Sequence, residues 1–283
     1  MNKNIYPCIW FNGRGSEAGK YYAETFDGAK VTHDSGMVVT WQAADCTFML
    51  LDAGPNFKPN FSISFMVMCE TAEELDRYWA RLSKDGKIMM ELAKYPWSER
   101  YGWLEDQFGV SWQLYLGAGA PQKFVPTLMF TGVNNGKCME AMEYYTRVFP
   151  NSKIDGAMKY EEGGDDTPGH VAHAQFYIND YMLMGMDSSM DHGVQFDEGI
   201  SIVVTTKDQE ETDYYWNTFT SEGEESMCGW LKDRYGISWQ ITPARLLELM
   251  ADPDREKAGR VMQAMMKMRK IVIADLEAAY AGA

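Results

Sequence analysis

The sequence predicts an α+β protein that consists of two tandem copies of one domain, followed by a helical tail. Three observations support this prediction. A long motif occurs twice, further landmarks repeat around it in the same order, and short strand-like segments alternate with helical ones in each copy. The length of 283 residues also suits two domains of about 150 residues each.

The repeated motif closes each copy. Residues 102–113 have the sequence GWLEDQFGVSWQ, and residues 229–240 have the sequence GWLKDRYGISWQ. Further upstream, Ile63-Ser64 and Tyr78-Trp79 return as Ile200-Ser201 and Tyr215-Trp216. A shared order with drifting offsets indicates an old duplication whose loops have since changed length.

These landmarks set the predicted domain boundaries. The first copy spans residues 1–120, the second spans 121–243, and the tail spans 244–283. The junction at 117–121 is short and rich in glycine and alanine, as expected of a linker.

The hydrophobic pattern of the first copy predicts its elements in order. We expect strands at 7–11, 37–43, 46–51, 61–68, 101–104 and 111–116, and helices at 16–26 and 71–83. Ser16 is a candidate N-cap for the first helix, and Thr71 with Glu74 forms a capping box for the second. The second copy keeps this box as Asp208 with Glu211. The resulting order is βαβββ twice in each copy, unlike the βαβα order of a parallel nucleotide-binding sheet.

The tail has a different character. Asp252-Pro253 supplies an N-cap and a proline for a first helical position. Apolar residues then recur every three or four positions between Val261 and Ala279, which predicts one amphipathic helix of about 28 residues. Such a helix suits a strap across the domains or a dimer contact, and its acidic residues disfavour a membrane-surface role.

Composition excludes several classes of function. Acidic residues outnumber basic ones by 41 to 26, so the net charge of −15 disfavours nucleic acid as a partner. The 5 cysteines are scattered and never spaced as CxxC, which suits reduced thiols in a cytoplasmic protein. No apolar run approaches the length of a membrane span, so we expect no membrane partner.

The motifs resemble those of one superfamily. The openings Phe11-Asn12-Gly13 and Phe130-Thr131-Gly132 and the closing pattern D-x-[FY]-G-[VI]-S-W-Q are similar to the vicinal-oxygen-chelate superfamily of glyoxalases, bleomycin-resistance proteins and extradiol dioxygenases. Residues 228–233 and 264–268 resemble its PhnB-like branch, often labelled 3-demethylubiquinone-9 3-methyltransferase. The resemblance implies glyoxalase/bleomycin-resistance-like domains, each with two βαβββ modules that form a cupped mixed sheet around a small ligand.

The resemblance also indicates where relatives hold a metal ion. Their three ligand positions fall near Cys8, Ser64 and Gln113 in the first copy and near Thr127, Ser201 and Gln240 in the second. None of these residues is a carboxylate or an imidazole, and a neutral amide is a poor ligand for a transition metal. We therefore assign no metal ligands and no cofactor, and we keep a divalent metal ion as an open alternative.

The second copy contains polar groups that the first lacks. His173, Gln175 and Tyr177 alternate along one strand and share a face, and Glu198 precedes the strand at 200–204. His173 and Glu198 are the candidate catalytic residues, because an imidazole near neutral pH and a carboxylate can move protons. We therefore expect the second copy to hold the functional cup, and the first to have drifted toward a scaffold.

The remaining candidates are residues expected to line a ligand site. Gln113 and Gln240 follow tryptophans in the repeated motif, and a tryptophan wall with one amide suits a small organic ligand. Cys228 lies beside that motif, where a buried, inert thiol is the alternative. The candidate ligand-binding residues are Trp112, Gln113, Gln175, Cys228, Trp239 and Gln240.

Three functions are compatible with these features. The first is a small-molecule-binding protein without a metal, and the second is an isomerase- or lyase-type enzyme that uses His173 and Glu198, with or without a divalent metal. The third is an assembly protein, with a homodimer through sheet edges or the tail helix. Methylation by adenosylmethionine is not expected: the glycine-rich loop at 13–19 is not kept at 132–136, and no series of parallel βα units follows it.

Overall fold

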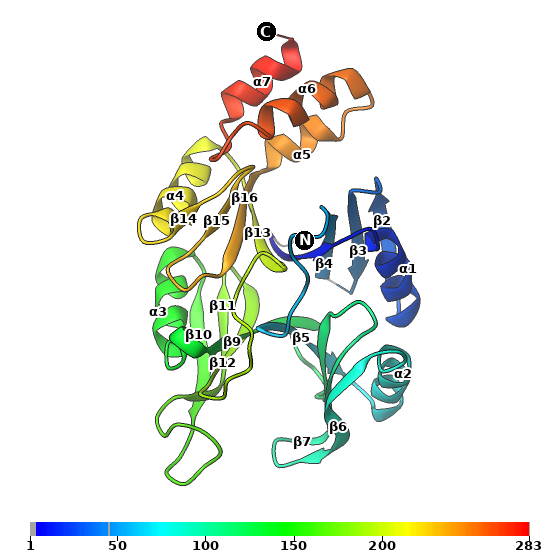
Figure 1. Cartoon of the computed structure of the whole chain (residues 1–283), viewed down its shortest axis with the longest axis vertical. Helices are drawn as coiled ribbons and strands as arrows, with labels where there is room; N and C mark the ends of the chain where they lie inside the picture. The colour runs from blue at the N-terminus through cyan, green and yellow to red at the C-terminus, as the bar shows by residue number, and fades with distance from the viewer. Residues whose placement is uncertain (1–3, 45, 283) are drawn as a thin grey trace. The chain divides into compact units, whose positions relative to one another are not determined.

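The computed structural model describes residues 4–44 and 46–282 of the chain (Figure 1). Its helices and strands follow one another as four βαβββ modules, and a helical tail follows the last module. This order confirms the α+β fold class and the internal duplication predicted from the repeated motif.

The first copy of the repeat supplies two modules. The first module contains β1 (Ile5–Phe11), α1 (Gly15–Thr25), β2 (Lys30–Asp34), β3 (Val38–Ala43) and β4 (Cys46–Asp52). The second module contains β5 (Ile63–Cys69), α2 (Ala72–Leu82), β6 (Lys87–Tyr95), β7 (Ser98–Glu105) and β8 (Ser111–Leu116). The sequence pattern placed most of these strands within two residues, but it assigned no position to β2 or β6. Both have mostly exposed or half-exposed side chains and therefore lack a strong apolar signal.

The second copy repeats this series. Its first module contains β9 (Phe124–Thr131), a 3-10 turn at 132–134, α3 (Cys138–Val148), β10 (Lys153–Lys159), β11 (Val171–Ile178) and β12 (Tyr181–Ser188). Its second module contains β13 (Ile200–Thr206), α4 (Gln209–Thr220), β14 (Glu224–Glu225), β15 (Trp230–Lys232) and β16 (Ser238–Pro243). In each of the four modules the first strand pairs in parallel with the last, which requires the crossover that the helix provides.

One eight-stranded sheet, called sheet B here, joins modules from different copies. Its order is β10-β11-β12-β9-β5-β8-β7-β6. The two modules meet where β5 pairs antiparallel with β9, from Ile63 opposite Leu128 to Val67 opposite Phe124. The cupped mixed sheet expected of this fold is therefore built across the duplication, and sheet B takes one module from each copy.

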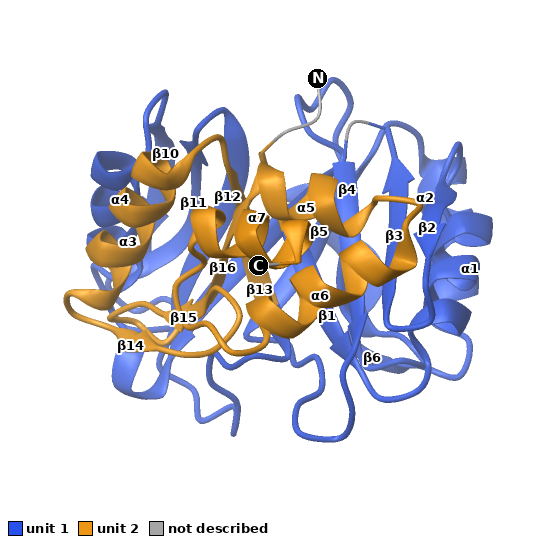
Figure 2. Cartoon of the chain, turned by 90° about the horizontal axis from the view of Figure 1, so that it is seen from above, with its two compact units in different colours: residues 1–3, 7–200 blue, residues 4–6, 201–283 orange. Residues whose placement is uncertain are grey.

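The chain divides into two compact units, which Figure 2 colours separately. Residues 7–200 belong to the first unit, and residues 4–6 and 201–283 belong to the second. Sheet B lies wholly within the first unit. This division follows contacts and not the repeat, and the boundary at 120/121 stays a prediction about the duplicated segments.

Aromatic side chains form the core of the first unit between its helices and strands. Trp41 stacks between Phe26 and Phe48, at ring-centroid distances of 5.7 and 4.4 Å. Trp112 and Phe124 pack around them, and both are almost completely buried. Burial of such large rings, and not a disulfide, stabilises this unit.

The two predicted capping boxes are present. Thr71 Oγ1 accepts a hydrogen bond from the Glu74 amide at 3.1 Å, and Asp208 Oδ1 accepts one from the Glu211 amide at 2.9 Å. The N-cap prediction for Ser16 is wrong. Helix α1 begins at Gly15, and Ser16 Oγ instead donates to Asp34 at 2.8 Å.

The tail is helical, but it is not one continuous helix. It contains α5 (Ala244–Met250), α6 (Arg255–Met265) and α7 (Ile273–Ala281), which Figure 1 shows as separate segments. Asp254, not Asp252, caps α6, and Asp252 accepts a hydrogen bond from Tyr280. The apolar periodicity is real because α6 and α7 each bury one face against a shared cluster of Leu246, Leu249, Val261, Ile271 and Leu276. Among the described residues, no helix is both long and apolar enough to cross a membrane.

Candidate functional site

One face of sheet B is lined by methionine and tyrosine side chains. Met66, Tyr101, Val125, Met182 and Met184 form a buried cluster, and each is at most 6% exposed. Further side chains of this kind pack against them while staying partly exposed: Met68, Met90, Tyr95, Trp103, Tyr115 and Tyr177. We call this surface the methionine face. Phe65, Phe124 and Phe176, which alternate with its residues, point to the opposite side of the sheet.

Strand register brings several sequence-predicted positions into one row across this face. Gln175 on β11 lies opposite Met184 on β12, and Met184 lies opposite Thr127 on β9. Thr127 in turn lies opposite Ser64 on β5. Since these strands belong to both copies, the face that carries Gln175 is as much a product of the first copy as of the second.

Gln113 on β8 extends this row through side-chain hydrogen bonds. Its Nε2 donates to Ser64 Oγ at 2.7 Å, and its Oε1 accepts from the Tyr101 hydroxyl at 2.7 Å. The amide is only 5% exposed, so both of its ends are satisfied inside the protein. Gln113 is therefore held rigidly at the edge of the methionine cluster.

His173 lies on β11, two residues before Gln175 and on the same side of the strand. Its side chain is partly buried, and burial lowers the pKa of the imidazole below its ordinary value. The ring is consequently neutral at pH 7 and can accept a proton. Gln175 Nε2 donates to Asp155 Oδ2 at 3.0 Å and to the Tyr177 hydroxyl at 3.3 Å, and these two bonds orient the amide on the strand that also carries His173.

Glu198 lies in the segment between β12 and β13, two residues before Ile200, where β13 begins. Glu198 is partly buried. The structure places it outside the strands of sheet B, whereas His173 is part of that sheet.

Trp112 and Trp239 occupy equivalent positions in a buried network. The Nε1 of each donates to an aspartate Oδ2 at 2.8 Å, with Asp106 as the acceptor in the first copy and Asp233 in the second. Both indoles are completely buried. In each closing motif, the aspartate and the tryptophan are therefore hydrogen-bonded to each other inside the protein. Because both indoles are buried in this way, we leave them out of the proposed ligand site.

Gln240 repeats the first bond of Gln113. Its Nε2 donates to Ser201 Oγ at 3.0 Å, and the amide is 6% exposed. The position equivalent to Tyr101 is Cys228, which has a positive φ of 60° and whose amide donates to Met268 O at 2.7 Å. Burial raises the pKa of the Cys228 thiol, so the thiolate is disfavoured there.

On sheet B, the residues at the three positions where the resemblance implies metal ligands do not fit a metal ion. On sheet B these positions are Thr127, Ser64 and Gln113, which the register and the Gln113–Ser64 hydrogen bond bring together. Thr127 and Ser64 supply only hydroxyls, and both ends of the Gln113 amide are already hydrogen-bonded. None of the three side chains offers an anionic ligand. Among the described residues, no group of three or more His, Cys, Asp or Glu side chains could hold a metal.

The glycine-rich loop at 13–19 has a structural role. The amides of Gly13 and Gly15 both donate to the carboxylate of Asp52, the second at 2.8 Å. In the second copy, Asp187 accepts from the amides of Gly136 and Cys138 at 2.9 and 3.0 Å. In the first module of each copy, a carboxylate from the last strand thus satisfies the first amides of the helix.

Sequence reasoning missed the methionine face itself. The signal was present as alternating methionines at 66 and 68 and at 182, 184 and 186, which one face of a strand explains. What the sequence alone did not reveal is that these two strands, from different copies, belong to one sheet.

Comparisons with known proteins agree with this fold. The family described as 3-demethylubiquinone-9 3-methyltransferase matches residues 3–115 and, again, residues 122–242. The PhnB protein from Bacillus cereus is 33% identical over a match that covers 40% of this chain and 98% of that chain, with a TM-score of 0.37. Glyoxalase I from Zea mays is similar in fold, with a TM-score of 0.54 and 14% identity over 84% of this chain and 92% of that one. A search of curated proteins gives no match.

Proposed function

Because this chain belongs to the 3-demethylubiquinone-9 3-methyltransferase family, which matches it twice, we propose that it is a small-molecule-binding protein whose ligand lies on the methionine face of sheet B. The fold, shared with glyoxalase I, is one that supports small-molecule binding. The ligand we propose is compact, organic and partly aromatic, and it needs no metal.

One observation carries this proposal: the row of Gln175, Met184, Thr127 and Ser64, extended by Gln113. It sets a few oriented polar groups into a surface of thioethers and aromatic rings, the composition typical of a small-molecule site. Methionine side chains are flexible and polarisable, so they adapt to flat rings. Both copies contribute to this row, so the proposed site is not mainly a property of the second copy.

The family's description names a methyltransferase, and we do not extend that activity to this chain. The loop that could cradle a cofactor carboxylate has the amides of Gly13 and Gly15 bound to Asp52. A ligand would have to displace that carboxylate from the start of α1.

The experiment is a thermal-shift screen with compact aromatic compounds, followed by calorimetry with Gln113→Leu and Gln240→Leu. The two variants form a matched pair, because each removes the same amide–serine hydrogen bond from one copy. We expect Gln113→Leu to weaken binding by about tenfold, and Gln240→Leu to leave the Kd unchanged. Equal effects, or no effect of Gln113→Leu, would contradict a site on the methionine face.

The alternative is an isomerase- or lyase-type enzyme that uses His173 and Glu198. The observation in its favour is the neutral imidazole of His173 on the strand face that also carries Gln175. The bound compound is incubated with the protein and followed by NMR. Conversion that His173→Gln abolishes, with binding retained, favours an enzyme, whereas an unchanged compound favours a binding protein.

A further inference from the structure

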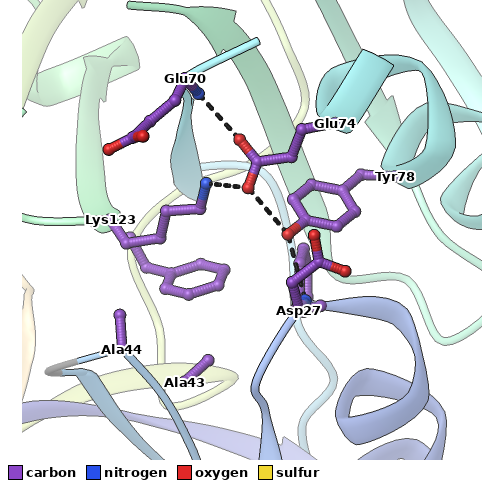
Figure 3. Close-up of a pocket in the computed structure, with 9 residues that line it drawn as sticks. Asp27, Ala43, Ala44, Glu70, Glu74, Tyr78 and Lys123 are labelled. Atoms are coloured by element: carbon purple, nitrogen blue, oxygen red, sulfur yellow. Dashed lines mark hydrogen bonds and ion pairs between the residues drawn. The ribbon is translucent and has the colours of Figure 1, made fainter. Parts of the chain in front are cut away.

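A separate cavity of about 220 Å³ lies in the first unit, away from the methionine face (Figure 3). Its apolar wall consists of Phe26, Tyr78 and Phe124, together with the last residue of β3, Ala43, and the next residue, Ala44. Phe124 and Val125 are neighbours on β9, so their side chains point to opposite faces, and Val125 belongs to the methionine face. The cavity is therefore a different place from the site proposed above.

Glu74, on the first turn of α2, organises the polar side of this cavity. Its carboxylate accepts from Lys123 Nζ at 2.6 Å, from the Tyr78 hydroxyl at 2.9 Å and from the Glu70 amide at 2.8 Å. Burial opposes its ionisation, but these hydrogen bonds outweigh burial and lower the pKa of the carboxyl. Glu74 is thus a fixed anion whose acceptor capacity is largely used inside the protein.

Lys123 has hydrogen-bonding capacity to spare. Its side chain is 18% exposed, and its ammonium lies 5.5 Å from the centre of the Tyr78 ring. An ammonium carries three donors, and within the described residues Lys123 donates to Glu74 alone. Figure 3 shows the ammonium beside the Glu74 carboxylate, among the side chains that line the cavity. It can therefore donate to a bound acceptor without giving up Glu74.

Glu70 adds a carboxylate at the rim. Its backbone amide binds Glu74, whereas its side chain is exposed and lines the cavity. Asp27 also lines the cavity, and its carboxylate is paired with Arg77 at 2.5 Å. Three carboxylates, of Asp27, Glu70 and Glu74, thus face two cations, of Lys123 and Arg77. This excess of negative charge disfavours a simple anion and leaves the Glu70 carboxylate to attract a cationic group.

We propose that this cavity is a second ligand site, which takes a small zwitterion with one carboxylate and one ammonium on a compact apolar body, such as a free amino acid with a large apolar side chain. The ligand carboxylate accepts from Lys123, and the ligand ammonium lies beside Glu70. The apolar body lies against Ala44 and against the edges of the Phe26 and Phe124 rings that line the cavity. This pairing matches both signs of charge at the cavity, which neither an anion nor a cation alone achieves.

The repeat supports a specialised role for Lys123. Glu74 and Tyr78 have the counterparts Glu211 and Tyr215, and Glu211 accepts from the Lys207 amide at 2.6 Å as Glu74 accepts from the Glu70 amide. Lys123 lies at the start of the second copy, directly before β9, and the residue at the same place before β1 in the first copy is Asn4, which is not a lysine. The capping box at the start of the helix therefore forms without such a lysine, which leaves the lysine's ammonium for another purpose.

The test is calorimetry with three compounds that share a phenyl ring and a two-carbon chain: L-phenylalanine, 3-phenylpropanoate and phenethylamine. We expect L-phenylalanine to bind at least about tenfold more tightly than either singly charged analogue, because only it engages both Lys123 and Glu70. Equal binding of the three, or no binding of L-phenylalanine, overturns the proposal.

Variants locate the binding. Lys123→Met keeps the apolar stem and removes the donors, and Glu70→Gln removes the exposed carboxylate. Each is expected to weaken L-phenylalanine binding at least about tenfold. Glu73→Gln, on the first turn of α2 but outside the cavity lining, and Gln113→Leu should leave it unchanged. If Lys123→Met fails to fold, the exposed Glu70→Gln carries the test. Binding unchanged by Glu70→Gln, or lost in Gln113→Leu, contradicts a site in this cavity.

Discussion

The ends of the two copies share one motif and differ in what surrounds it. In both, an aspartate accepts two backbone amides and a tryptophan indole: Phe108, Val110 and Trp112 bind Asp106, and Tyr235, Ile237 and Trp239 bind Asp233. In both, the following glutamine donates to a serine on the neighbouring parallel strand.

The surroundings diverge one strand away. In the first copy, β6 and β7 form a hairpin of 9- and 8-residue strands, and Tyr101 on β7 binds Gln113. In the second copy, the equivalent strands have 2 and 3 residues, and the chain at Cys228 and Gly229 instead donates to Met268 O and Arg269 O of the tail. The motif therefore specifies a local turn and one buried network, whereas the neighbouring chain decides whether a broad sheet face forms beside it.

The largest expected effect tests whether the shared network contributes equally to the free energy of unfolding in both copies. Asp106→Asn and Asp233→Asn each replace one carboxylate oxygen with an NH2 group, which faces the tryptophan indole donor when the remaining oxygen accepts from the two backbone amides. Loss of the charged acceptor and this clash of donors should lower the free energy of unfolding by about 4 kcal/mol. The measurement is urea unfolding followed by tryptophan fluorescence. Losses that differ by more than about 2 kcal/mol would show that the two networks are not equivalent.

The next test concerns the tail that replaces the hairpin in the second copy. Ile271 is completely buried, and its Cγ1 lies 3.2 Å from where a Cβ on Gly229 would be. Ile271→Ala should therefore cost about 3 kcal/mol, because it leaves a cavity between the tail and the turn. Met266→Ala, at a position that is 61% exposed, is the control and should cost less than about 0.5 kcal/mol. A small loss for Ile271→Ala would mean that the tail does not support this turn.

A third prediction uses pH to isolate Asp106. Burial raises the pKa of this carboxyl to about 6, above its ordinary value of 3.8, although four hydrogen bonds oppose the shift. The folded state thus holds the proton more tightly than the unfolded state, so this group stabilises the fold at low pH and that contribution is lost as pH rises from about 4 to about 6. At about 1.4 kcal/mol per pKa unit, the loss is about 3 kcal/mol.

The measurement is the unfolding free energy at pH 4, 5, 6 and 7 for the wild type and Asp106→Asn. The difference in unfolding free energy between the wild type and the variant should grow by about 3 kcal/mol as pH falls from about 7 to about 4, because only the wild type gains stability by protonating this carboxyl. A wild-type curve parallel to that of Asp106→Asn would refute the raised pKa.

The smallest effects compare Tyr101 with its counterpart. Tyr101→Phe removes the donor to the buried Gln113 Oε1 and should cost about 1 kcal/mol. Cys228→Gly should stabilise the protein by about 1 kcal/mol, since a φ of 60° strains any residue with a Cβ. Thermal melting of the two variants, followed by circular dichroism, should move in opposite directions. A lower Tm for Cys228→Gly would show that its thiol packing outweighs the strain.

Much of the fold was readable from the sequence for a physical reason. The duplication left the same buried aspartate, tryptophan and glutamine in both copies, and capping residues such as Thr71 marked where helices begin. Local periodicity misled where a distant group decides the outcome. Asp52, and not Ser16, satisfies the first turn of α1, and the tail breaks between α6 and α7 although its apolar residues keep a helical spacing.

The candidate site was only partly predictable. The alternation of His173 with Gln175 on one strand face was correct, because side chains alternate along any strand. The association of Gln113 with this face was not deducible, since it depends on the pairing of β5 with β9 across the duplication. The sequence did not single out Lys123 either, because its proposed role depends on Glu74 and Tyr78, which lie close to it only in the folded chain.

The pairing of β5 with β9 has one further consequence. Each strand supplies the edge that the other module needs, so a polypeptide with a single copy would have to borrow that edge from a second molecule. Fusing the copies turned an encounter between molecules, which depends on concentration, into a closure within one chain. If the gene were split within the linker at 117–121, the two polypeptides should find each other again and purify as a pair.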